Sequence, residues 1–397
     1  MSNLSSSRPI VITANSSFYL LHYRELLIKN LSKKNHIITI SPKDKSSNNL
    51  SKLSINLPWR IDRKKDRNPF SFIISLVRMS FLIRAIKPKM VHSHTLRTNL
   101  IIAIICSFYS IPCILSFTGL GILSKENESK LIFKIILKTI MLFSIYEKKG
   151  FINWKKNINR ARFIFQNQND LLVFSSINKH SLEISKLIYG SGIPNRFFDK
   201  RYSANLFVRK FNTKESVFRF QFIYCARLLI SKGIKTFLKI ANNHPEHDFI
   251  IFGDFDISSK DSINKSDFFS LSKKKNIAFR GYVENPLLTI DYKNPILVVP
   301  SNYGEGLPRA ILEAFSLKIP VICSPSATIN LFTEKYLYIA SEKSFNNYQI
   351  IIYQINDEFK NGKLKLKIDK AYNFSKKFTE KKIINQTKDL YSELLNY

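Results

Sequence analysis

Short runs of apolar and β-branched residues recur along the chain, with helical stretches between them. In the first half these runs begin at residues 9, 36, 89, 112 and 162, and in the second half they begin at residues 220, 248, 277, 296 and 320. Buried parallel strands alternate in this way with the helices that cover both faces of their sheet. The pattern predicts an α/β protein with two doubly wound, Rossmann-like domains in tandem.

The stretch from 188 to 216 separates the two sets of runs and has no clear period. It contains Gly190, Gly192 and Pro194, which are typical of a linker. A chain of 397 residues also exceeds what one hydrophobic core usually organises. We therefore expect one domain over 1–200 and a second over 201–375, followed at 376–397 by an amphipathic helix that packs back across the domains.

Residues 98–124 carry no charge, and that length alone would allow a membrane span. Pro112, Gly119 and Gly121 interrupt the segment, so it predicts a helix over 98–109 and a buried strand over 112–117. The N-terminus lacks an apolar core of signal-peptide length, which argues against secretion. The four cysteines form no CxxC pair and indicate buried free thiols in a reducing compartment, with no zinc site.

Lys and Arg number 62 against 29 Asp and Glu, a formal net charge of +33. Such an excess predicts a polyanionic partner, which could be a nucleic acid, a membrane surface or a phosphorylated substrate. No nucleic-acid-binding motif accompanies the charge. Lys130, Lys134 and Lys138 recur every four residues in an otherwise apolar helix, and 59–90 is similarly basic. Both segments suit an anionic membrane surface, and an ordinary solvated face is the alternative.

The stretch PSNYGEGLPRAILEAFSLKIPVI (300–322) predicts the end of a strand, a turn, and a helix from Leu307 with Pro308 in its first turn. Free amides around Gly306 would then face the carboxyl edge of a parallel sheet, where phosphate groups bind. Glu305 and Glu313 could accept hydrogen bonds from hydroxyl groups at two ends of one sugar-containing ligand. Alternatively, Glu305 complements the helix dipole and Glu313 pairs with a nearby lysine.

The segment EGLPRAILEA resembles the signature of the family-4 retaining glycosyltransferases, whose fold is called GT-B. The resemblance implies that Glu305 holds the donor sugar and Glu313 the ribose of the nucleotide, beside Gly306, Leu307 and Pro308. YCARLLISKGIKTFLKIA resembles the family's diphosphate-binding stretch, which implies this role for Arg227 and Lys232. FRGYVEN resembles the turn that meets the nucleobase through the backbone around Tyr282 and Val283.

In the first domain VHSHT, FTGLG, FQNQND and YGSGI resemble the subgroup that builds bacterial polysaccharides on polyprenyl-linked carriers. The acceptor-side candidates are Ser16, His94, Thr118 and Gly119. The chain departs from the family at Thr118, where many members have His, and at Ser16 and Ser17, where glycines are common. After PVICS it reads PSATINLF and lacks the usual Gly and Glu.

Together these features predict a retaining glycosyltransferase of the hexosyltransferase class, cytoplasmic and peripheral at the inner face of the cell membrane. It would move a sugar from a UDP-sugar to a polyprenyl-linked saccharide of a surface polysaccharide such as O-antigen or capsule. We expect no cofactor and no divalent metal, with Arg227, Lys232 and the helix amides stabilising the leaving diphosphate instead. The alternatives are a sugar-nucleotide epimerase of the same architecture and a non-catalytic basic protein that binds membranes or nucleic acid.

Overall fold

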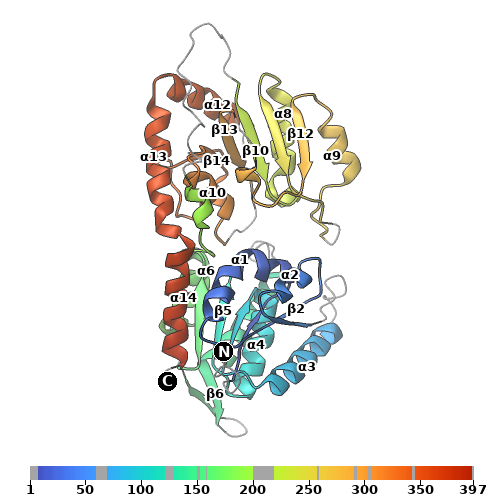
Figure 1. The fold of residues 1–397 in the computed structure, drawn as a ribbon, viewed down its shortest axis with the longest axis vertical. Helices are drawn as coiled ribbons and strands as arrows, with labels where there is room; N and C mark the ends of the chain where they lie inside the picture. The colour runs from blue at the N-terminus through green and yellow to red at the C-terminus, as the bar shows by residue number, and fades with distance from the viewer. Residues whose placement is uncertain are drawn as a thin grey trace. The chain divides into compact units, whose positions relative to one another are not determined.

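The computed structural model describes residues 8–59, 69–120, 129–149, 153–157, 159–199, 219–256, 259–289, 293–302, 306–341 and 345–395. The chain forms two compact units (Figure 1). Unit 1 comprises Met1–Ser191 together with Glu380–Tyr397, and unit 2 comprises Gly192–Thr379. The chain therefore passes between the units twice, once after Ser191 and once after Thr379.

Unit 1 is built on a seven-stranded parallel sheet in the order β3-β2-β1-β4-β5-β8-β9. Chain order reverses between β1 and β4, which makes their carboxyl ends the switch point where ligands of doubly wound folds bind. The strands are β1 (Ile10–Thr13), β2 (Ile37–Ser41), β3 (Ile55–Pro58), β4 (Met90–His94), β5 (Cys113–Phe117), β8 (Ala161–Phe165) and β9 (Ser185–Leu187). An antiparallel hairpin of β6 (Tyr146–Lys149) and β7 (Asn153–Lys156) lies outside this sheet.

Helices cover both faces of the unit 1 sheet, because alternate strand residues belong to different hydrophobic clusters. In β1, Val11 packs in one cluster and Ile10 and Ile12 in the other. The first cluster is covered by α3 (Pro69–Ile86), α4 (Leu96–Phe108), α5 (Ser129–Ile145) and α6 (Gln168–Ile177), with the 3-10 helix η2 (Lys179–Ile184). The second is covered by α1 (Ser17–Leu31), α2 (Ser47–Ser51) and α14 (Glu380–Leu395).

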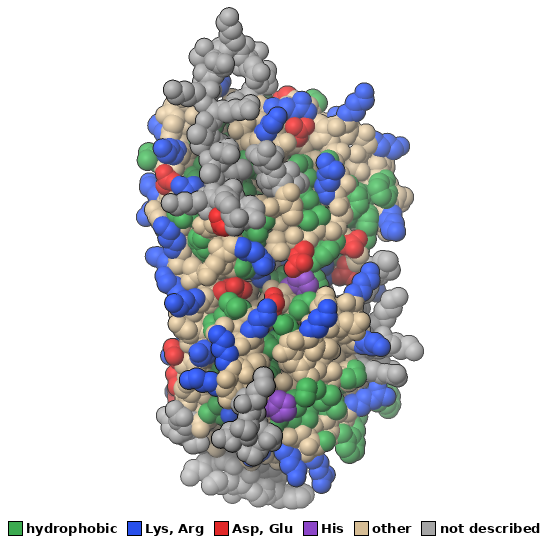
Figure 2. Space-filling model, viewed as in Figure 1, with side chains coloured by type: hydrophobic (Ala, Val, Ile, Leu, Met, Phe, Trp, Pro, Cys, Tyr) green, Lys and Arg blue, Asp and Glu red, His purple; other side chains and the backbone are tan. Residues whose placement is uncertain are grey.

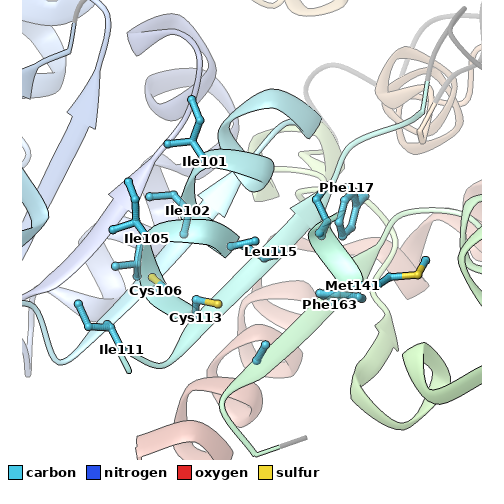
Figure 3. Close-up of a cluster of buried hydrophobic side chains, with 14 of the residues drawn as sticks. Ile101, Ile102, Ile105, Cys106, Ile111, Cys113, Leu115, Phe117, Met141 and Phe163 are labelled. Carbon is cyan, nitrogen blue, oxygen red and sulfur yellow. The ribbon is translucent and has the colours of Figure 1, made fainter. Parts of the chain in front are cut away.

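The described part of the uncharged segment, residues 98–120, belongs to the core as predicted, and residues 121–124 lie outside the described residues. Figure 3 shows Ile102, Ile105 and Cys106 of α4 facing Cys113 and Leu115 of β5. The helix and strand that the sequence predicts at 98–109 and 112–117 are α4 and β5. All four cysteines are free thiols, and three of them are buried. Within the described part of the chain, no helix is both long enough and apolar enough to cross a membrane.

Unit 2 holds a six-stranded parallel sheet in the order β12-β11-β10-β13-β14-β15, so its switch point lies between β10 and β13. The strands are β10 (Gln221–Cys225), β11 (Asp248–Phe252), β12 (Ile277–Gly281), β13 (Pro295–Val299), β14 (Val321–Cys323) and β15 (Tyr338–Ile339). The helices are η3 (Asn195–Phe198), η4 (Ile230–Lys232), α8 (Ile234–Asn243), α9 (Lys265–Leu271), η5 (Pro286–Leu288), α10 (Arg309–Ser316), α11 (Pro325–Thr328), α12 (Phe345–Lys360), α13 (Lys363–Ser375) and η6 (Lys376–Phe378).

All ten strands that the sequence predicts are present, and the prediction of two doubly wound α/β units with a GT-B arrangement of strands is confirmed. The structure adds three short strands, β3, β9 and β15, at or next to sheet edges, together with the β6-β7 hairpin. The amphipathic C-terminal helix is α14, and it belongs to unit 1. Its buried face consists of Ile383, Ile384, Thr387, Leu390, Tyr391 and Leu394.

Candidate active site

The carboxyl edge of the unit 2 sheet carries most of the predicted donor-binding residues. Arg227 and Lys232 follow β10, Tyr282 and Val283 follow β12, and Gly306 to Glu313 follow β13. Because β10 and β13 flank the switch point, these segments border the position where a nucleotide binds in doubly wound folds. Glu305 belongs to the stretch 303–305, which is outside the described residues.

Glu313 lies in the second turn of α10 and is largely buried, with 14% of its side chain exposed. Its Oε1 accepts a hydrogen bond from Arg309 Nε at 2.6 Å, so its partner is an arginine one turn earlier and not a lysine. Burial raises the pKa of the Glu313 carboxyl, and Arg309 and Arg196 oppose that rise. Burial and the charge of Glu313 raise the pKa of the Cys225 thiol at the end of β10.

The start of α10 corrects one sequence prediction. The helix begins at Arg309 and not at Leu307, because Pro308 has an extended backbone (φ −67°, ψ 94°) and occupies the position before the first helical residue. Gly306 and Pro308 are buried and Leu307 is half-buried. The first backbone amides of the helix are therefore those that begin at Arg309, two residues later than predicted.

Arg196 is a site residue that the sequence analysis missed. It lies in η3, and its Nη2 donates to Asn285 Oδ1 at 3.0 Å. Its charge also lowers the pKa of Glu313. Arg196 is therefore hydrogen-bonded to the loop after β12, which carries Tyr282 and Val283, and its charge acts on the carboxylate of α10. Only its position, shortly after YGSGI, hinted at a role.

Arg227 is half exposed, and its Nη1 forms an ion pair with Asp256 Oδ2 at 2.6 Å. Asp256 follows β11, so this pair joins two neighbouring strand ends. A phosphate group at Arg227 would compete with this carboxylate or use the other guanidinium nitrogens. Asp256 is a second residue that sequence reasoning missed, although it closes the triplet Asp254-Phe255-Asp256 directly after β11.

Lys232 ends η4, which is held against the end of β13. Gly233 has a φ of +80°, and a Cβ atom there would lie 2.1 Å from the Pro300 carbonyl oxygen. Asn302 N also donates to Ser231 O at 2.9 Å. A glycine is needed at this close approach, which sets the Lys232 backbone beside the segment that leads to Gly306.

Tyr282 and Val283 directly follow β12, as predicted, and the Tyr282 ring is half exposed. Burial of its hydroxyl and the charge of Glu284 raise the pKa of Tyr282. A half-exposed ring at a strand end fits contact with a planar base.

The acceptor-side candidates lie at the ends of strands of the unit 1 sheet. Some of them make contacts that explain their presence, and His94 makes none. Ser16 caps α1, because its hydroxyl accepts the Tyr19 N–H at 3.1 Å. His94 ends β4, is fully buried, and has no hydrogen-bond partner for either ring nitrogen. His92 contacts Tyr391 Oη and Ser116 Oγ, each at 2.7 Å, so it is satisfied structurally.

Thr118 and Gly119 follow β5, and Gly119 has a φ of +114°. The next residue, Leu120, donates its N–H to the carboxylate of Asp170. Asn167 Nδ2 also donates to Asp170 Oδ2 at 2.9 Å, while Asp170 N donates to Asn167 Oδ1 at 2.8 Å. Burial raises the pKa of Asp170 to about 6, against the effect of both hydrogen bonds to its carboxylate. Asp170 is the last residue of FQNQND, and nothing in that segment alone marks its carboxyl as buried.

One group of metal-ligand side chains occurs among the described residues. His244, Glu246 and His247 place ligand atoms within 4.8 Å of one another. They precede β11 and so lie at the amino edge of the sheet, opposite the predicted donor-binding residues. Glu246 already accepts from His244 Nδ1 at 2.8 Å, which accounts for the group as a hydrogen-bonded cluster.

The comparisons with known proteins agree with this geometry. Residues 209–333 match the family model of the glycosyl transferases group 1, and residues 10–147 match that of the glycosyl transferase 4-like proteins. The chain is 23% identical to a UDP-Gal:α-D-GlcNAc-diphosphoundecaprenol α-1,3-galactosyltransferase of Escherichia coli, over 81% of this chain and 79% of that protein.

Two further comparisons extend the similarity. The chain is 24% identical to the capsular polysaccharide biosynthesis glycosyltransferase CapM of Staphylococcus aureus, over 79% of this chain and 77% of that protein. The crystal structure of Anabaena HepE in complex with UDP and glucose superposes with a TM-score of 0.72 at 14% identity, covering 98% of this chain and 100% of that one. The chain is a glycosyltransferase with the GT-B fold, and it resembles the enzymes that build polysaccharides on polyprenyl carriers.

Proposed function

We propose that the protein is a retaining glycosyltransferase that takes a sugar from a UDP-sugar and adds it to a polyprenyl-linked saccharide during bacterial surface polysaccharide synthesis. The observation that carries the proposal is the buried Glu313 at the β10–β13 switch point, held by Arg309 and near Arg196. HepE binds UDP and UDP-glucose, which supports a UDP-linked donor. The name of the Escherichia coli relative supports an acceptor that carries a diphosphate-linked lipid.

Each part of the donor then has a recognising group. The Glu313 carboxylate accepts hydrogen bonds from the ribose hydroxyls, and the backbone around Tyr282 and Val283 meets the base. The free amides at the start of α10 face the diphosphate. By its resemblance to the family, Glu305 holds the transferred sugar.

The leaving diphosphate gains negative charge as the glycosidic bond breaks. Arg227 and Lys232 supply a planar guanidinium and a compact ammonium at the end of β10, in place of a divalent ion. Retention of configuration would follow if the acceptor hydroxyl attacks from the face that the diphosphate leaves, with a phosphate oxygen taking the proton.

A Glu313→Gln variant tests the ribose contact. Glutamine keeps the shape but removes the charge, so we expect UDP affinity to fall by about 10- to 100-fold, equivalent to the 1.5–3 kcal/mol of one charged hydrogen bond. Isothermal titration with UDP measures this, and Glu358→Gln, which changes a carboxylate on α12 bonded to Tyr338, is the control. Unchanged UDP binding in Glu313→Gln would remove the proposed ribose site.

A second test concerns the metal. We expect transfer to survive EDTA, and Lys232→Ala to lower the rate by about 10- to 1,000-fold, as loss of one transition-state donor does. Initial rates with labelled UDP-sugars and native membrane lipids give both values. Activity that EDTA abolishes and manganese restores would contradict the proposed role of the cations. Conversion of the donor without any acceptor would instead indicate an epimerase.

A membrane-bound acceptor requires the enzyme to reach the bilayer, and we place the contact on α3 and α5 of unit 1. Large apolar side chains on both helices are exposed, including Phe70 (73%), Phe81 (67%) and Leu131 (68%). Lys134 and Lys138 are exposed between them on α5, and neither helix contains an acidic residue. Figure 2 shows hydrophobic side chains next to Lys and Arg in the region of α3. This composition suits the inner, anionic face of the cell membrane.

A further inference from the structure

The short helix η4 is held against a segment of unit 2 that follows β11. Leu229 and Ser262 pair as an antiparallel bridge. Ile230 N donates to the carbonyl oxygen of Asp261 at 2.8 Å. Two stretches that lie 30 residues apart in the sequence therefore meet at the carboxyl edge of the sheet, where Lys232 ends η4.

The carboxylate of Asp261 binds Ser231, the residue before Lys232. Ser231 N lies 3.2 Å from both Asp261 Oδ1 and Oδ2, and Ser231 Oγ donates to Asp261 Oδ2. Hydrogen bonds to an ionised acceptor are stronger than those between neutral groups. The Ser231 carbonyl oxygen accepts from Asn302 N at 2.9 Å and from Ser301 Oγ at 3.4 Å. Ser231 is thus bound through its amide, its hydroxyl and its carbonyl group.

Packing alone does not fix η4. None of its three residues is buried, and a single 3-10 turn is too short to be stable by itself. The hydrogen bonds to Ser231 therefore help to set the backbone from which the Lys232 side chain extends. A charged group that stabilises a transition state must be placed beforehand, and a displacement of about 1 Å can cost about 100-fold in rate.

We propose that Asp261 is a positioning residue for sugar transfer. It fixes Ser231, and through Ser231 it sets where Lys232 presents its ammonium group to the diphosphate of the donor. Asp261 itself would not contact the donor, because a carboxylate repels a diphosphate. This inference rests on the proposed function, which assigns the diphosphate to Lys232.

The test compares initial transfer rates of full-length variants, with labelled UDP-sugars and native membrane lipids as substrates. Asp261→Asn keeps the shape of the side chain but removes its charge and replaces one acceptor oxygen with a donor. We expect this variant to transfer about 10-fold more slowly or worse. Asp261→Asn/Lys232→Ala should be no slower than Lys232→Ala alone, because both changes remove the same contribution.

Further variants separate positioning from a general effect on the fold. Ser231→Ala removes the hydroxyl group and should lower the transfer rate, whereas Ser231→Thr retains that group and should keep most of the rate. Asp248→Asn is the matched control, because Asp248 accepts two hydrogen bonds from Arg219 at the amino edge of the same sheet. It should transfer at the full rate.

Hydrogen exchange measures the fixing of η4 without any transfer reaction. In Asp261→Asn the backbone amides of 230–233 should exchange about 10-fold faster or more, because fewer bonds oppose local opening. The amides of β10 should exchange as they do in the unmodified chain.

A full transfer rate in both Asp261→Asn and Ser231→Ala would overturn the positioning role. A double variant whose loss equals the product of the two single losses would overturn it as well. If Lys232→Ala keeps its full rate, or if the unmodified chain transfers no sugar, the proposed function is contradicted instead. Exchange then decides alone whether Asp261 fixes η4, and unchanged exchange at 230–233 in Asp261→Asn would show that it does not.

Discussion

At the scale of single residues, the buried carboxyl group of Asp170 lowers the stability of the folded state when it is ionised. Its pKa is about 6, against an ordinary value of 3.8, because it is buried. The folded state therefore holds the proton more tightly than the unfolded chain does. The protonated Asp170 side chain therefore contributes to stability below about pH 4, and this contribution is lost as the pH rises through 6. The loss is about 1.4 kcal/mol per pKa unit, or about 3 kcal/mol in all.

We predict that Asp170→Asn removes this pH dependence. Relative to the unmodified chain, the variant should gain about 3 kcal/mol of unfolding free energy between pH 4 and pH 7.5, because asparagine carries no charge to bury. Urea unfolding at several pH values measures the difference, and any constant effect of a lost hydrogen bond cancels. Asp357→Asn, on the exposed part of α12, is the control. A difference that does not vary with pH would refute this account of Asp170.

The residues of the site also show what a sequence can predict. Arg227, Lys232, Tyr282, Val283 and Glu313 stand where motif and strand end coincide, so their place on the unit 2 sheet edge could be foreseen. Arg196 and Asp256 could not, because each reaches its partner across a long stretch of chain: Arg196 to Asn285, and Asp256 to Arg227. Such pairs are set by strand order, and no local spacing records them.

At the scale of elements, the long buried strands were predictable and the short ones were not. β15 has two residues and β9 has three, too few for a hydrophobic period to appear. β3 is exposed at both ends and carries no apolar run. The start of α10 was placed two residues early because proline is common in first turns, whereas Pro308 here keeps an extended backbone.

The helices α3 and α5 give the prediction at this scale. We expect the chain to bind anionic vesicles more tightly than neutral ones, and Lys134→Glu/Lys138→Glu to weaken that binding and its salt dependence. Each basic residue near such a surface contributes about 1 kcal/mol. Phe70→Ser/Phe81→Ser should reduce the part of the binding that persists at high salt, because that part depends on buried apolar area.

Vesicle co-sedimentation at low and high salt measures both effects. Lys235→Glu/Lys239→Glu changes two exposed lysines with the same spacing on α8 of unit 2, and it should bind as the unmodified chain does. Equal losses in the α5 and α8 variants would show that net charge, and not this surface, governs the interaction.

At the scale of the whole molecule, α14 ties the end of the chain into unit 1. Tyr391 Oη lies 2.7 Å from His92 Nδ1, and the apolar face of the helix completes the second hydrophobic cluster. Tyr391→Phe should lower the unfolding free energy of unit 1 by about 1–3 kcal/mol, because it leaves a buried His92 nitrogen without a partner. Hydrogen exchange should show the loss in β4 and α1 and none in β10 or α8; a uniform loss would mean that the helix stabilises both units alike.

The return of α14 to unit 1 also has a consequence for how the protein is made. The strands of unit 1 are made before unit 2, yet the second hydrophobic cluster of unit 1 lacks one of its covering helices until residues 380–395 are made. When residues 192–379 have been made, unit 2 has every residue it needs, whereas the part of the unit 1 sheet face that α14 covers is still exposed. The unit whose strands come first in the chain is thus completed last, so a chain that ends before residue 380 would keep on unit 1 an apolar surface of the kind that chaperones bind, although unit 2 has all of its residues.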